Sequence, residues 1–117
     1  MVRKVELVIY EMLDAILGIE DATRGLTFQQ VQQAWILRHG VQRGIEIISE
    51  ASRRLPADLL SSRPEVPWPT LRAIGNVLRH EYHNIADEVL WGVVKRDLPV
   101  LKAALVAMQA DIDNAKS

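Results

Sequence analysis

The stretch PWPTLRAIGNVLRHEYHNI, residues 67–85, combines a clear helix start with a dense set of reactive side chains. Pro69 has no backbone N–H and a φ angle fixed at about −65°, which suits the first turn of a helix. Trp68 before it is pushed towards extended backbone. A helix over about residues 69–83 then has one apolar face, made of Leu71, Ile74, Val77 and Leu78.

A second line of this predicted helix is polar and basic. It carries Arg72, Asn76, Arg79 and His83, with His80 one step round the helix. Arginine offers forked donors to a phosphate, and histidine gives and takes protons near neutral pH. Two interpretations follow from the residues alone. The line is either a solvated surface or a site that holds a phosphodiester and moves its protons.

The runs PEVPWPTLRAIGNVLRHEYHNI, residues 64–85, and VLWGVVKRDLPVLKAAL, residues 89–105, resemble the HepT-like branch of the HEPN superfamily. These are small all-helical proteins that act as toxins in bacterial toxin–antitoxin pairs. Their motif is an arginine, usually followed by asparagine, with a histidine five residues after the arginine and a tyrosine two residues further. Asn76, His80 and Tyr82 match this motif, and Gly75 stands in the place of the arginine.

The resemblance implies a metal-independent endoribonuclease that works as a homodimer. In the family, histidine and arginine promote attack of a ribose 2′-hydroxyl on the adjacent phosphodiester. His80 would carry the proton-transfer role, with Asn76 beside it. Arg79, one turn below Gly75, or Arg72, nearly one turn above it, would hold the phosphate. We expect glycine to leave open the space of the missing side chain.

The resemblance also implies a protein partner. In the family, a nucleotidyltransferase of the MntA type attaches AMP to the motif tyrosine and so silences the toxin. Tyr82 is the matching residue. A second interpretation follows from Gly75: a dimer without useful turnover, alone or in a larger assembly, that serves as an interaction protein for the nucleotidyltransferase.

Composition limits the class of protein. The chain has 117 residues, which suits a single domain over residues 1–117. Fourteen basic and fifteen acidic residues give a net charge of −1, which argues against a broad surface that coats nucleic acid. Any RNA contact is therefore expected to be local. The chain has no cysteine and no long apolar run, so we expect a soluble, cytoplasmic protein that does not enter a membrane.

Metal and cofactor chemistry have weak sequence support. His80 and His83 are three residues apart with Glu81 between them, but no further ligand at a matching spacing completes a metal site. The sequence has no glycine-rich phosphate loop after a strand. We therefore expect neither a metal nor a cofactor.

The first half of the chain predicts two helices. One covers residues 3–23, and Gly25 follows as a left-handed cap. A much longer one opens at Thr27, where Gln30 completes a capping box, and is stopped by Pro56. Its apolar face is expected to contain Phe28, Val31, Ala34, Trp35, Val41, Ile45, Ile48 and Leu55.

Three residues inside this long helix have expected structural roles. Gly40 and Gly44 indicate close approach of another helix, from the same bundle or from a second subunit. Arg43 is expected to pair with Glu46 or Glu50 rather than to act in catalysis.

The second half predicts a connector and further helices. Residues 56–67 are rich in proline and serine and are expected to link helices, with one short turn. A helix begins near Asp87, and Pro99 either starts a last helix capped by Asp97 or kinks one long helix that continues to about Ile112. The predicted fold is all-α: an antiparallel bundle of four to five helices, HEPN-like, with one long central helix.

Overall fold

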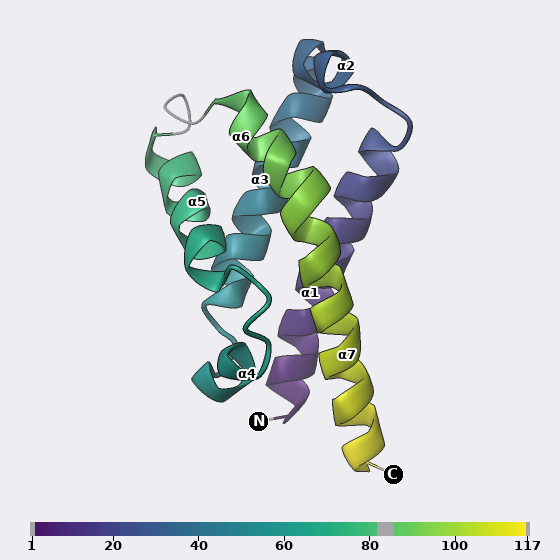
Figure 1. Ribbon diagram of the computed structural model, residues 1–117, viewed down its shortest axis with the longest axis vertical. Helices are drawn as coiled ribbons and strands as arrows, with labels where there is room; N and C mark the ends of the chain where they lie inside the picture. Colours follow the sequence, from purple (N-terminus) through teal and green to yellow (C-terminus); the bar gives the residue numbers. More distant parts are fainter. Residues whose placement is uncertain (1, 82–85, 117) are drawn as a thin grey trace.

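The computed structural model describes residues 2–81 and 86–116, and every regular element in these ranges is helical. The bundle consists mainly of α1 (Val2–Thr23), α3 (Trp35–Ser52), α5 (Trp68–Glu81) and α7 (Leu98–Lys116). Helices α1 and α5 flank α3, and α7 runs along α1 (Figure 1). The predicted all-α fold is confirmed.

The first helix ends as its sequence predicts. Gly25 has a φ angle of 75°, in the left-handed region that favours glycine. The Leu26 amide donates to the Thr23 carbonyl oxygen at 3.0 Å, which closes the turn. The capping box that follows is also confirmed, because the Thr27 hydroxyl accepts from the Gln30 amide and the Gln30 side chain accepts from the Thr27 amide.

The long helix expected from Thr27 to Pro56 is interrupted. Helix α2 covers Phe28–Gln33, and Ala34 is extended, with φ −93° and ψ 103°, before α3 begins. Alanine is the strongest helix former, so local preference does not explain the break. Tertiary contacts do: Phe28 packs against Trp91, with ring centroids 6.0 Å apart, and Gln32 donates to Asp87. Helix α2 makes both contacts with α6 (Asp87–Gly92).

The glycines of α3 have different roles. A Cβ atom added to Gly44 would lie 2.7 Å from Ile19 Cδ1, so the expected close approach exists and comes from α1 of the same chain. A Cβ atom added to Gly40 would have no neighbour within 4 Å. Gly40 therefore does not mark a tight helix contact within this chain.

The proline-rich connector contains one short helix, α4 (Ala57–Ser62), as predicted. Its end is fixed by the buried Trp68, whose indole N–H lies 3.1 Å from both the Leu60 and Arg63 carbonyl oxygens. This contact holds the connector against the start of α5. Pro69 lies in the first turn of α5, as expected.

The last part of the chain is one continuous helical path that contains a π-helical turn. Helix α6 leads into a π-helical turn, η2 (Val93–Asp97), which leads directly into α7. Within η2 the Leu98 amide donates to the Val93 carbonyl oxygen, five residues back. This wider turn comes just before Pro99, which has no N–H and whose ring would collide with the preceding turn of a regular helix. Of the two expectations for Pro99, the one long helix fits, and its irregular part is the π-helical turn.

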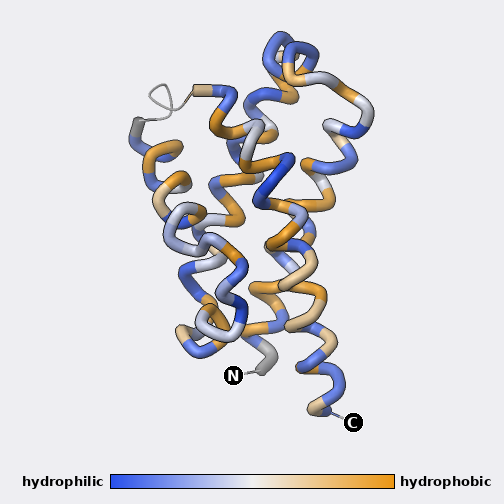
Figure 2. The backbone as a smooth tube through the Cα atoms, in the orientation of Figure 1, coloured by the Kyte–Doolittle hydropathy of each residue, from blue (hydrophilic) through white to orange (hydrophobic). Residues whose placement is uncertain are grey.

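The core lies between α1, α3, α5 and α7. Along the main helices, apolar positions recur every three to four residues between polar ones (Figure 2). Each of these helices therefore has one apolar face. The largest fully buried side chains include Ile9, Met12, Ile16, Ile45, Ile48, Leu71, Leu98, Leu101, Leu105 and Met108. Across the described ranges, no helix combines the length and apolar character needed to cross a membrane.

Candidate active site

Three of the predicted site residues gather at the carboxyl end of α5. Arg79 Nη2 donates to Asn76 Oδ1 at 2.8 Å, and Arg79 Nε lies 3.4 Å from His80 Nε2. All three side chains are exposed. They come together because positions three and four residues apart share one face of a helix. The site is therefore open to a large ligand.

A fourth member, Glu50, comes from the middle helix. Arg79 Nη1 lies 3.0 Å from Glu50 Oε1, with 39% of the arginine side chain and 42% of the glutamate side chain exposed. The sequence predicts Glu50 only as a partner of Arg43. Its contact with Arg79 spans 29 positions of sequence, and no local spacing rule points to it.

These contacts fix the orientation of the Arg79 guanidinium. A guanidinium has five N–H donors, and three of them point towards Glu50, Asn76 and His80. Two donors remain for another acceptor. Arg79 is thus held in place and still able to bind two oxygens of a phosphate.

The contact with His80 bears on how the imidazole can act. The Arg79 Nε–H points towards Nε2, an arrangement that suits the tautomer with a lone pair on Nε2 and a proton on Nδ1. The distance of 3.4 Å is longer than an ordinary N–H donor distance. Nε2 is therefore held only weakly and remains available as a proton acceptor.

Arg72 lies apart from this group. It is eight residues before His80, a rise of about 12 Å along the helix. Its carbonyl oxygen accepts from the Ser49 hydroxyl at 3.1 Å and from Arg53 Nη2 at 3.0 Å. Within the described part of the chain its guanidinium has no hydrogen-bond or ion-pair partner, and Nε is buried. Of the two candidate arginines, only Arg79 contacts His80.

The expectation that Gly75 leaves open space is wrong. Gly75 is buried where α5 crosses α3, and a Cβ atom added there would lie 2.0 Å from Ser49 Oγ and 2.2 Å from Ser49 Cβ. Glycine is required for this close approach. No larger side chain fits at this position without moving the two helices apart, so the arginine of this site lies elsewhere on α5.

The charges around the site are mixed but locally positive. Arg43 forms an ion pair with Glu46, as expected. The described side chains on this side of α3 and α5 are the arginines 43, 53, 72 and 79 and the glutamates 46 and 50. The whole chain has a net charge of −1, so the site region carries more positive charge than the chain on average. This fits the expectation of a local RNA contact.

The motif tyrosine and one residue of the polar line fall outside the described ranges. Tyr82 and His83 follow directly after the last described residue of α5, and their expected roles stay predictions. Among the residues that are described, no group of three histidine, aspartate or glutamate side chains gathers in a way that could hold a metal ion.

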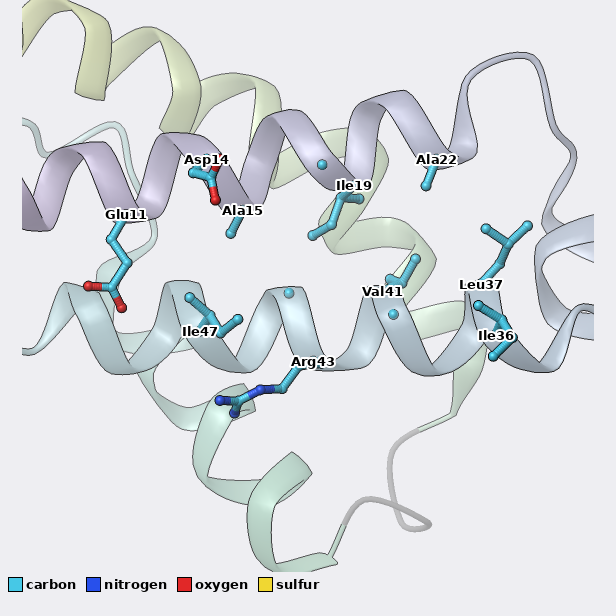
Figure 3. Close-up of a pocket in the computed structure, with 13 residues that line it drawn as sticks. Glu11, Asp14, Ala15, Ile19, Ala22, Ile36, Leu37, Val41, Arg43 and Ile47 are labelled. Atoms are coloured by element: carbon cyan, nitrogen blue, oxygen red, sulfur yellow. The ribbon is translucent and has the colours of Figure 1, made fainter.

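An apolar recess lies between α1 and α3, away from this group. It has a volume of about 600 Å³ and is lined mainly by aliphatic and small residues (Figure 3). Ala15, Ile19 and Ala22 of α1 face Ile36, Leu37, Val41 and Ile47 of α3. Its charged lining residues are Glu11, Asp14 and Arg43, and Arg43 is directed away from α1 in Figure 3. The recess contains no histidine, so the proton-transfer candidate lies elsewhere.

Comparison with known proteins assigns the chain to a family. A family model described as "Ribonuclease HepT-like" matches residues 12–108, which is most of the chain. The chain belongs to the HepT-like ribonuclease family. This places it in the HEPN superfamily, as its motif residues indicate.

Individual relatives of this HepT-like chain support the same assignment. A protein named probable ribonuclease HepT from Thermococcus cleftensis is 36% identical over 92 residues, covering 79% of this chain and 84% of the relative. A putative RNase from Methanocaldococcus jannaschii is 32% identical over 100 residues, covering 86% and 92%. No solved structure matched the sequence. The HepT-like family name and these relatives point to RNA as the class of substrate.

Proposed function

We propose that this chain is a metal-independent endoribonuclease that cleaves RNA through attack of a ribose 2′-hydroxyl on the adjacent phosphodiester. The observation that carries the proposal is the exposed group formed by His80, Arg79 and Asn76, in which Arg79 Nε lies 3.4 Å from His80 Nε2. It joins a proton acceptor and a fixed cation on one open surface.

Each residue of the group has a separate role in the proposed reaction. His80 Nε2 accepts the proton of the 2′-hydroxyl while the 2′-oxygen forms a bond to phosphorus. The bond from phosphorus to the 5′-oxygen breaks, and that oxygen leaves with a proton from a general acid. Arg79 donates to the phosphate oxygens, where negative charge grows in the transition state. Asn76 and Glu50 hold Arg79 in the required orientation.

The active unit in this proposal is a homodimer. The reaction needs both a base and an acid, and His80 can hold only one of these protonation states at a time. Two copies of the chain supply two such histidines. The biological role proposed is that of a toxin in a toxin–antitoxin pair. An MntA-type nucleotidyltransferase would silence it by attaching AMP to Tyr82, two residues after His80.

The test is cleavage of cellular RNA by the purified chain in the presence of EDTA. We expect His80→Ala and Arg79→Ala each to lower the rate at least a hundredfold, because each removes a group that acts in the transition state. Arg72→Ala should retain most of the rate, since Arg72 does not contact His80. Arg24→Ala is the matched control: Arg24 is exposed, and Asp21 pairs with it three residues away, as Asn76 does with Arg79.

The outcomes separate the two interpretations of the sequence. Cleavage that depends on His80 supports the nuclease. If the natural chain is folded, as judged by its helical content and its unfolding, but does not cleave RNA, the result favours a dimer that serves as an interaction protein. A Gly75→Arg variant cannot serve as a control for regained activity, because Ser49 occupies the position that its side chain would need.

The role of Tyr82 has its own test. The chain is incubated with ATP and an MntA-type nucleotidyltransferase, and its mass is measured. We expect addition of AMP to the natural chain and to Tyr10→Phe, and none to Tyr82→Phe. Tyr10 is a suitable control because it is 66% exposed. AMP on Tyr82→Phe would contradict the assignment.

A further inference from the structure

Trp35 is exposed although the sequence places it on the apolar face of a helix. It is the first residue of α3, directly after the extended Ala34, and 62% of its surface is accessible. The break at Ala34 thus turns a large aromatic side chain out of the core. Departures from local sequence preference that leave an aromatic group exposed are typical of binding surfaces.

The exposed indole is already ordered. Its ring lies against the imidazole of His39, with centroids 4.2 Å apart and planes at 31°. His39 Nδ1 in turn lies 2.8 Å from the Trp35 carbonyl oxygen, which fixes the imidazole. One face of the indole is therefore supported by His39, and a flat ligand could stack on the accessible part without first ordering the side chain.

Trp35 and the candidate active site lie along the same line of α3. His39, Arg43, Glu46 and Glu50 follow Trp35 at intervals of four, four, three and four residues, which places all five on one helix face. Glu50 at the end of this line is the partner of Arg79. The line connects the indole to the group around His80.

A polar recess occupies the middle of this line. It has a volume of about 220 Å³ and is lined by His39, Gln42, Arg43, Glu46 and, from α5, Leu78. Leu78 is two residues from His80. Trp35 lies about 16 Å along α3 from Glu46, a distance that a few nucleotides of single-stranded RNA can span. The recess therefore lies between the indole, which contacts His39, and the end of α5 that carries His80, and Arg43 lines it.

We propose that Trp35, supported by His39, is a stacking site for a base of single-stranded RNA near the phosphodiester at His80. This inference rests on the proposed ribonuclease function. Aromatic side chains bind bases of any sequence through stacking. The recess beside the indole is lined mainly by polar and charged side chains, and two cations, Arg43 and Arg79, lie along this surface, each paired with a glutamate. Both features favour a polyanion over an apolar protein surface.

The experiment measures binding of a 2′-O-methyl oligoribonucleotide, which cannot be cleaved because it lacks a free 2′-hydroxyl. We expect Trp35→Ala to weaken binding about tenfold, from the loss of one stacked base. Trp35→Phe should bind within about threefold of the natural chain. Tyr10→Ala, which removes another exposed aromatic ring on α1, should bind like the natural chain.

Tryptophan fluorescence gives a second readout. The oligonucleotide should quench part of the emission of the natural chain, and this quenching should be lost in Trp35→Phe although binding is retained. The other tryptophans serve as internal references, because Trp68 is buried and Trp91 packs on Phe28.

The results distinguish this inference from the ribonuclease proposal. Binding that depends on Trp35 in a chain that never cleaves RNA would support the stacking site and overturn the nuclease. If the natural chain cleaves RNA but the Trp35→Ala variant binds the oligonucleotide as tightly as the natural chain, the stacking site alone is overturned. A failure of the natural chain to bind the oligonucleotide would also overturn the stacking site. A Trp35→Ala effect seen only on the oligomeric state would assign the indole to a protein contact and overturn the inference.

Discussion

At the residue scale, Glu50 controls how much positive charge Arg79 presents to a phosphate. Its carboxylate lies 3.0 Å from Arg79 Nη1, and both side chains are partly exposed. Such a surface pair stabilises the fold by at most about 1 kcal/mol. Its larger effect is on an incoming phosphate, which is attracted by the arginine and repelled by the glutamate.

This predicts the effect of Glu50→Gln. The amide keeps an oxygen acceptor for Arg79 but removes the negative charge, so RNA should bind about two- to fivefold more tightly at low salt. The gain should shrink as salt rises. Glu11→Gln is the matched control, because Glu11 pairs with Arg54 at 2.9 Å outside the site. Weaker RNA binding by Glu50→Gln would show that the charge is needed to orient Arg79.

The sequence predicts some site residues better than others. His80, Arg79 and Asn76 lie within five positions on one helix, so helical spacing and the motif are enough to find them. Glu50 and the exposed Trp35 could not be found in this way. Glu50 reaches Arg79 through the packing of α3 on α5, and Trp35 is turned outward by a break at an alanine.

At the element scale, the contact between α3 and α5 depends on Gly75. A Gly75→Ala variant would place a methyl group within 2.2 Å of Ser49 Cβ, so we expect a loss of about 1–3 kcal/mol in the free energy of unfolding. The loss should be smaller in a Ser49→Gly background, which removes the obstructing atoms. Urea denaturation of the natural chain, both single variants and the double variant measures this coupling.

Gly40→Ala is the control for this experiment. It also lies within a helix, but a Cβ atom there has no neighbour within 4 Å. Alanine should therefore stabilise the chain by up to about 1 kcal/mol. If Gly75→Ala stabilised the protein to the same extent, the close packing of α5 on α3 would be refuted.

A second prediction at this scale concerns the capping box of α2. Thr27→Ala removes the hydroxyl that accepts from the Gln30 amide at 3.1 Å and should lower the free energy of unfolding by about 1 kcal/mol. Thr70→Ala, an exposed threonine in the first part of α5, should change it little. Equal stability of the two variants would mean that the capping box contributes nothing measurable.

The helices themselves were largely predictable from local sequence. Gly25, the Thr27 capping box and Pro69 mark boundaries that the structure confirms. The break at Ala34 was not predictable, because it is produced by contacts of α2 with α6 rather than by the residue itself. A helix continuing through Pro99 was one of two alternatives, but the π-helical turn before Pro99 was not predicted.

At the scale of the whole molecule, the distribution of charge limits where RNA can bind. The net charge of −1 gives no general attraction to nucleic acid, and arginines gather on the side of α3 and α5 that carries His80. We expect RNA binding to fall with rising salt, but with the shallow slope of a few phosphate contacts. A steep dependence of RNA affinity on salt would indicate many more phosphate contacts than the arginines near His80 can make.

The chemistry of the RNA ends after cleavage in EDTA tests whether the 2′-hydroxyl attacks the phosphodiester with help from His80. Attack by the 2′-hydroxyl predicts 2′,3′-cyclic phosphate and 5′-hydroxyl ends, produced by the natural chain and by Arg24→Ala and absent with His80→Ala. Ends bearing a 5′-phosphate and a 3′-hydroxyl would contradict the account, as would cleavage that persists in His80→Ala or a natural chain that leaves RNA intact.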